Sequence, residues 1–151
     1  MSPERPRAAG PSQESLSPAP GVLPSMKHID VVRDEELCGF DSTNGIRRQK
    51  AFDRKGIVVA RTQVPRSAAS GWHHHGKRHL YAYLVAGQLR LEYGPGGTMV
   101  AETRRGDFFH IPPRLVHRDV NPSPDEDVVV VNVLVGEGEN VFNVPAPVRR
   151  R

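Results

Sequence analysis

The sequence predicts an all-β sandwich or barrel, and a jelly roll is one form of such a fold. From residue 56 onward, short segments rich in Val, Leu, Tyr and Phe alternate with Gly and Pro. No segment of this half repeats its apolar residues at the helical period of 3.6. Residues 128–135 are almost continuously apolar, which predicts a strand buried on both faces.

The predicted strands follow one another at close spacing. They cover roughly residues 56–64, 71–75, 80–86, 88–93, 98–103, 107–111, 115–120 and 127–135. Within 88–93, apolar and polar side chains alternate, as in a strand with one wet face. The Gly-Pro-Gly-Gly run at 94–97 predicts a hairpin turn. Eight short strands with these breaks favour a sandwich or barrel.

The two ends differ in composition from this strand-rich half. Residues 1–25 carry six prolines among Ser, Gly and Ala, which predicts a disordered arm. Residues 26–145 form the expected barrel domain, in which 26–33 can be an extended edge segment and 41–45 a loop. Residues 146–151 end in three arginines and are expected to be a basic tail.

Length, charge and composition restrict the class of protein. A chain of 151 residues with 37% hydrophobic and 25% charged residues suits one globular domain. It has no apolar run long enough for a membrane helix and no signal-peptide core, so we expect a cytoplasmic protein. Its single cysteine, Cys38, excludes an internal disulfide. The net charge of +4 comes largely from the terminal arginines, and no nucleic-acid-binding motif accompanies it.

Histidines are the most informative residues of the chain. On a strand, His73 and His75 share one face and His74 points away. His117 brings a third imidazole if its strand pairs near the first. Three histidines with open positions are a known catalytic metal arrangement, although adjacent histidines also occur in polar loops. His110 is more typical of a structural histidine, and His28 receives no role.

Two motifs resemble those of the cupin superfamily. Gly106, Pro112, His117 and Asn121 fall on the frame of the second cupin motif, with Arg114 in place of a glycine. His73, His75 and Gly87 fall on the frame of the first motif. In that motif Leu80 occupies the position of the usual glutamate, and Ser67 occupies that of the leading glycine. The resemblance covers residues 56–136, most of the chain outside the arm.

The resemblance implies a cupin jelly roll, or double-stranded β-helix barrel, with a metal near one mouth. The ligands that it carries over are His73, His75 and His117. Leu80 cannot ligate a metal, so the site resembles the three-histidine variant of some cupin dioxygenases. His79 is a possible fourth ligand, but strand alternation places it opposite Leu80. Without the glutamate the site keeps a charge of +2, which favours anionic chelators such as carboxylates or β-dicarbonyls.

The ligand type leaves several metals and reactions open. Imidazole nitrogens suit one divalent Fe(II), Zn, Ni, Cu or Mn ion. Iron would indicate a dioxygenase-like oxidoreductase, and zinc would indicate a lyase or isomerase. Tyr81 and Tyr83 are candidates for an acid–base hydroxyl, although strand parity turns both outward. We expect the substrate pocket to be mostly apolar and the substrate partly apolar. Its candidate lining residues are Leu80, Ala82, Phe109, Val116 and Val133.

Other classes of function remain open at this point. A small-molecule sensor without turnover is compatible with the lost glutamate and with Arg114. Recruitment of a partner protein by the Pro-rich arm has only weak sequence support. Small cupins often pair through an outer sheet, so we expect a homodimer in which residues 26–33 cross to the neighbour. Arg61 and Arg90 are candidates to anchor a carboxylate if they turn inward.

Overall fold

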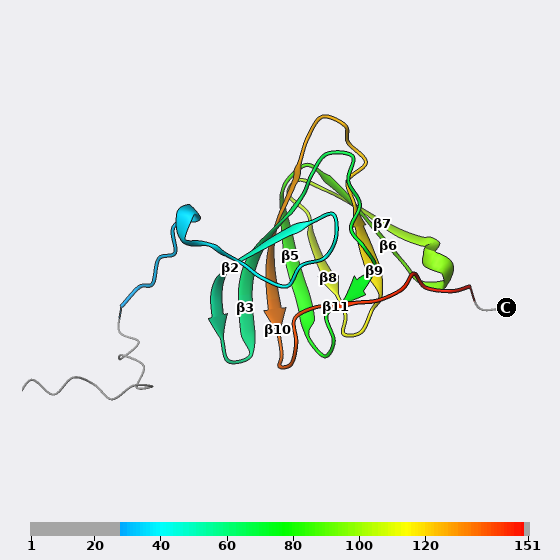
Figure 1. Ribbon diagram of the computed structural model, residues 1–151. Coiled ribbons are helices and arrows are strands. Elements are labelled where there is room, and N and C mark those ends of the chain that lie inside the picture. Colours follow the sequence, from blue (N-terminus) through cyan, green and yellow to red (C-terminus); the bar gives the residue numbers. More distant parts are fainter. Residues whose placement is uncertain (1–27, 150–151) are drawn as a thin grey trace, which may run out of the picture. The chain divides into compact units, whose positions relative to one another are not determined.

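The computed structural model describes residues 28–149, and the predicted arm at 1–25 lies outside them. From Val32 onward the chain forms one compact unit. Two antiparallel sheets enclose its core (Figure 1). Among the described residues no helix is long and apolar enough to cross a membrane.

The larger sheet has six strands in the order β1-β2-β3-β10-β5-β8. Their bounds are β1 Cys38–Gly39, β2 Arg47–Arg54, β3 Ile57–Val64, β5 His79–Ala86, β8 Phe108–Ile111 and β10 Val128–Val135. A short 3₁₀ turn, η1 (Asp34–Glu36), precedes β1. β10 lies between β3 and β5, so the last long strand of the chain inserts between two earlier ones. This crossover is typical of one sheet of a jelly roll and differs from a simple meander.

The smaller sheet has five strands in the order β11-β4-β9-β6-β7. Their bounds are β4 His73–His74, β6 Gln88–Tyr93, β7 Met99–Arg104, β9 His117–Val120 and β11 Phe142–Asn143. The turn η2 (Pro95–Gly97) joins β6 to β7 at the glycine-rich run where a hairpin was predicted. The β4–β9 pairing matters most for function, because it aligns two stretches of chain more than forty residues apart.

The core lies between the two sheets. Leu89 and Leu91 come from β6 of the smaller sheet, and the other buried apolar residues come mainly from the larger one. The full set is Val58, Ala60, Val64, Leu80, Ala82, Leu84, Leu89, Leu91, Ile111, Val128, Val130 and Leu134. On β5 the inward side chains alternate strictly with exposed ones, as the two-residue period of a strand requires.

The all-β jelly roll predicted from the sequence is confirmed, and each of the eight predicted strands has a counterpart. One expectation about β10 is wrong. It was predicted to be buried on both faces, but Val131 and Val135 are each 39% exposed. β10 instead alternates, because only its inner face meets the core. The described chain also stays with the barrel beyond residue 145, where Gly96 N donates to Val148 O at 3.2 Å.

Candidate metal centre

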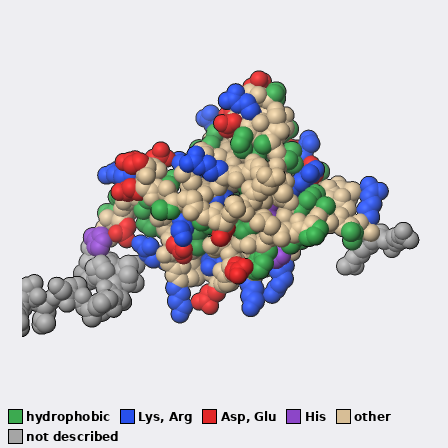
Figure 2. Space-filling view, viewed as in Figure 1, with side chains coloured by type: hydrophobic (Ala, Val, Ile, Leu, Met, Phe, Trp, Pro, Cys, Tyr) green, Lys and Arg blue, Asp and Glu red, His purple; other side chains and the backbone are tan. Residues whose placement is uncertain are grey.

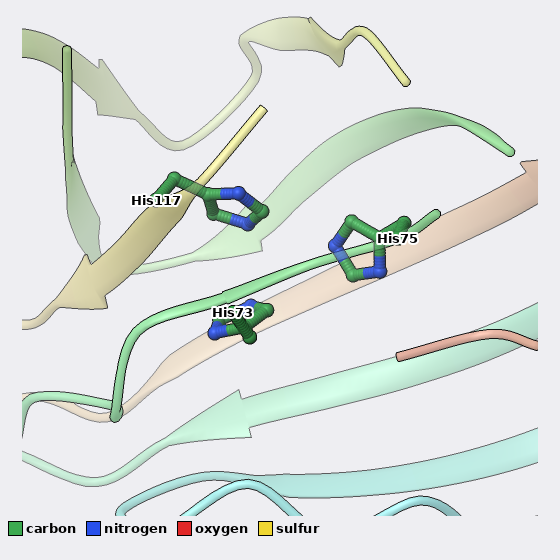
Figure 3. A group of neighbouring side chains, drawn as sticks. All are labelled: His73, His75 and His117. Carbon is green, nitrogen blue, oxygen red and sulfur yellow. The ribbon is translucent and has the colours of Figure 1, made fainter. Parts of the chain in front are cut away.

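Three histidines from two distant stretches of the chain meet inside the barrel (Figure 3). His73 opens β4, His117 opens β9, and the two are direct partners in the sheet register. His75 follows directly after β4 and stays on the same side as His73, as the alternation of a strand predicts. Strand pairing and alternation therefore bring the three imidazoles together.

The three rings lie close enough to bind one ion. Their centroids are 4.4 Å apart for His73 and His117, 5.2 Å for His75 and His117, and 5.4 Å for His73 and His75. One nitrogen from each ring lies within 4.8 Å of the other two. All three residues are at most 3% exposed. This is the only group of three or more His, Cys, Asp or Glu in the described residues with metal-binding spacing.

Hydrogen bonds to the backbone determine which nitrogen of each ring is free. Each Nδ1 lies 2.8–2.9 Å from a carbonyl oxygen. The pairs are His73 with Gly71, His75 with Asn140 and His117 with Leu115. A carbonyl only accepts, so each Nδ1 carries the proton and each Nε2 keeps its lone pair. Metal-ligating histidines are oriented by the same kind of contact.

Burial keeps these imidazoles neutral. Desolvation, aided by the charges of His117 and Arg48, lowers the pKa of His73 to about 2. Desolvation is also the main cause that lowers the pKa of His75 well below its usual value. The pKa of His117 falls for the same reason, although the carboxylate of Asp119 opposes the shift. Because neutral imidazole is the form that binds metals, the site is ready for an ion at neutral pH.

A small cavity of about 20 Å³ adjoins the three rings. Its polar walls are Arg48, Thr62, Asp119 and Asn132. Its apolar walls are Val64, Leu80, Leu89, Phe109, Ile111 and Val130. The volume corresponds to roughly one or two water molecules. The barrel therefore offers a small space next to the histidines, with both polar and apolar walls.

Comparisons with known proteins identify the family. Residues 60–134 match the family model described as the cupin domain, which spans both histidine motifs. The chain belongs to the cupin superfamily. No match was found among curated protein sequences.

Solved structures show the same cupin fold at low identity. The polyketide cyclase RemF of Streptomyces resistomycificus is 18% identical, with a TM-score of 0.62, 78% of this chain covered and 86% of that chain. An RmlC-like cupin of Shewanella frigidimarina is 18% identical, with a TM-score of 0.58, 73% of this chain covered and 93% of that chain. Oxalate decarboxylase of Bacillus subtilis is 19% identical, with a TM-score of 0.58, 68% of this chain covered but only 28% of its own length.

The position of the usual cupin glutamate points into the cavity. Leu80 occupies it, is 6% exposed and lines the cavity beside the three histidines. His79, the possible fourth ligand, is exposed and lies outside the cavity-lining residues. Its Nδ1 instead lies 2.9 Å from Nε2 of His110, and the two rings are stacked. The alternation of β5 therefore separates His79 from the three buried histidines.

Not all residues expected in the pocket line it. Leu80 and Phe109 do, but Ala82 packs in the core and Val133 is half-buried on the outward face of β10. Val116 lies by a separate surface hollow with Pro147. For Val133 the difference follows from strand parity, because Val130 and Asn132 are the β10 residues that reach the cavity.

The two tyrosines considered for acid–base chemistry point to solvent. Tyr81 is 49% exposed and Tyr83 is 39% exposed, on the outer face of β5. His74 also points away from the cavity, where its ring stacks on Phe142 at 4.9 Å between centroids. None of these three side chains lines the cavity.

The sequence analysis missed two charged residues of the site. Asp119 is 9% exposed, and its Oδ2 lies 3.9 Å from Nε2 of His73. It lies two residues after His117 on β9, so the alternation of that strand could have found it. Arg48 comes from β2, a charged strand without an apolar pattern, and nothing in the sequence indicated it. The proposed carboxylate anchors, Arg61 and Arg90, instead pair with Asp34 and Glu102.

Proposed function

We propose that this cupin is a mononuclear metal enzyme that acts on a small molecule. His73, His75 and His117 would hold the ion through Nε2. The observation that carries the proposal is the set of three backbone carbonyls that fix each Nδ1–H and leave three lone pairs facing one space. Burial and neutrality of the rings support it further.

The donor set fits a divalent transition metal. Three neutral nitrogen ligands suit Fe(II), Zn, Ni, Cu or Mn(II). These metals take four or more ligands, so at least one coordination position remains open for a substrate. With iron such a centre supplies dioxygenase-like oxidative chemistry, and with zinc it supplies Lewis-acid chemistry for a lyase or isomerase. The apolar walls formed by residues such as Leu89 and Ile111 would exclude bulk water from the reacting molecule.

Elemental analysis of the untagged protein beside His117→Ala tests this proposal. The wild-type protein should carry about one equivalent of metal per chain. His117→Ala should lower the affinity by more than about 100-fold, because groups that merely orient ligands already contribute about 10–100-fold. The matched control is His110→Ala, which removes an exposed imidazole outside the cavity and should keep its metal. Equal metal content in both variants would refute the proposed site.

A second candidate is a cupin that binds a small molecule without turnover. Leu80 in place of the glutamate fits a site that has lost catalysis. Metal-free protein that still binds a ligand would support this candidate, whereas one bound metal per chain with turnover would support the enzyme.

We also propose a homodimer formed through the outer face of the larger sheet. This face carries exposed apolar side chains on β5, β8 and β10, among them Tyr81, Phe108 and Val131. Phe108 is 79% exposed, and aromatic residues are enriched in interfaces between subunits. Light scattering at micromolar concentration tests the proposal, and a monomer would remove it.

A further inference from the structure

Arg48 carries a guanidinium nitrogen inside the barrel that has no partner. The residue is 7% exposed and lines the cavity of the three histidines. Its Nη1 donates to Asp41 O at 2.7 Å and to Thr43 Oγ1 at 2.6 Å. Its Nη2 has no hydrogen bond within the part of the chain that the structure describes. One half of the guanidinium is therefore anchored, and the other half remains free.

An unpartnered N–H of a buried cation is costly, because the group has lost its water without gaining an acceptor. Burial is the largest influence on Arg48 and lowers its pKa, while the opposing carboxylates of Asp119 and Asp41 contribute less. The two carboxylates thus offset only part of the cost of burying this cation. A bound anion would supply the missing acceptor for Nη2.

Arg78 shows that an unpartnered nitrogen is not sufficient on its own. Its Nη1 is also buried without a partner, and the residue is 8% exposed. Its Nε donates to Gly138 O at 3.0 Å, but the side chain does not line the histidine cavity. Of these two buried arginines, only Arg48 combines a free donor with a space for a ligand.

We infer that Arg48 is an anion-binding residue and that the histidine cavity takes a small carboxylate. The inference rests on the proposed function, since the carboxylate would lie between Arg48 and the three Nε2 atoms. The charges of Arg48 and Asp119 cancel, so a divalent ion leaves the site at +2. A carboxylate suits the planar guanidinium, whose N–H groups match two oxygens.

The cavity also limits the size of this ligand. A volume of about 20 Å³ holds formate more readily than a longer acid. Apolar side chains such as Leu80 and Phe109 line the space, so a larger ligand has to displace them. Affinity is therefore expected to fall from formate to acetate to benzoate.

Calorimetry with formate and formamide on the zinc-loaded protein provides the first test. Zinc has no redox chemistry, so binding is measured without turnover. Formamide has a similar size but no charge. We expect formate to bind at least about ten-fold more tightly, as charge-assisted hydrogen bonds require. Equal binding of the two, or no saturable binding of formate, overturns the inference.

Arg48→Gln and its matched control Arg78→Gln provide the second test. Arg48→Gln should weaken formate binding by at least about ten-fold and leave the zinc content unchanged. Arg78→Gln removes a buried arginine outside the cavity and should change neither quantity. Formate binding that survives in folded Arg48→Gln overturns the inference. If Arg48→Gln does not fold, formate and formamide are compared in the metal-free protein, where no ion attracts the carboxylate, and equal binding of the two overturns the inference.

The two proposals can fail separately. A protein that holds no zinc refutes the metal centre, and formate is then titrated into the metal-free protein. If the metal-free protein binds formate and Arg48→Gln abolishes this binding, the anion site is supported without the metal centre. If the protein binds zinc but does not bind formate, the metal centre is supported and the anion site is refuted.

Discussion

Two groups of histidines in this cupin have opposite surroundings. His73, His75 and His117, the inner histidines, are buried and each donates Nδ1–H to a backbone carbonyl. His79 and His110, the outer pair, are exposed, and their rings contact each other at 2.9 Å. His75 and His79 are only four residues apart, so position along the chain does not account for the difference.

The difference shows what makes a histidine a candidate ligand in this fold. The outer rings can exchange their partner for water, and their tautomers are not set by a carbonyl. Each inner ring has one nitrogen occupied by the backbone and the other facing the remaining rings. Burial also lowers the pKa of the inner histidines, so they present lone pairs at neutral pH.

The largest expected effect is the acid sensitivity of the metal-free protein. His73 has a pKa of about 2 when folded and about 6.5 when unfolded, so only the unfolded chain takes up its proton in between. Its contribution to stability is present above about pH 6.5 and is lost as the pH falls toward 2. The loss is about 1.4 kcal/mol per pH unit for His73, and the lowered pKa values of His75 and His117 add to it in the same direction.

Urea unfolding of the chelator-treated protein at about pH 7.5, 6 and 5 measures this slope. The double variant His79→Gln/His110→Gln serves as the control. It removes the outer pair and should show the same slope as the wild-type protein. A free energy of unfolding that does not change between these pH values would contradict the burial of the inner histidines.

The second prediction concerns the position that the cupin motif reserves for glutamate. Leu80→Glu places a carboxylate at a site that lines the cavity beside the histidines. Without metal it should destabilise the protein by about 2–4 kcal/mol, because a charge is buried and apolar packing is lost. With zinc the new ligand should offset part of this loss and raise the metal affinity.

Thermal unfolding with and without zinc measures both effects. Leu80→Gln, which has the shape of glutamate without its charge, is the matched control and should not gain affinity for zinc. If zinc stabilises the two variants equally, the side chain at position 80 does not reach the ion. That result would contradict the placement of this position beside the inner histidines.

Strands with a local pattern of apolar residues could be predicted from the sequence, whereas a strand defined only by its pairing with another could not. The eight strands from residue 56 onward were predictable because their apolar residues alternate or cluster between glycines and prolines. β2 was not, because its residues 47–54 include five charged side chains and its inner face is polar. Such a strand is defined by pairing with β3, which is a tertiary effect.

The candidate site divides in the same way. The inner histidines were predictable from the spacing of two motifs, and strand parity correctly turned Tyr81 and Tyr83 outward. The residues of the cavity wall were not fully predictable. Val133 was expected to line the cavity, but its neighbour Asn132 does so. Arg48 is anchored through hydrogen bonds to Asp41 O and Thr43 Oγ1, which no local pattern records.

The smallest expected effect concerns the backbone that holds His117. Arg114 stands where the cupin motif has glycine, and its φ of 61° lies in the left-handed region that favours glycine. Its N–H donates to Gly76 O at 2.8 Å, which joins the segments that carry His75 and His117. Arg114→Gly should therefore stabilise the protein by about 0.5–1 kcal/mol, as strain relief exceeds the added entropy of the unfolded chain.

Arg114→Ala separates this backbone effect from the loss of the exposed side chain. Alanine keeps a β-carbon and with it the strain, so it should give none of the gain. Urea unfolding of both variants at neutral pH measures the difference between them. A gain in Arg114→Ala equal to that in Arg114→Gly would assign the effect to the arginine side chain. The orientation of the inner histidines would then not depend on a strained turn at position 114.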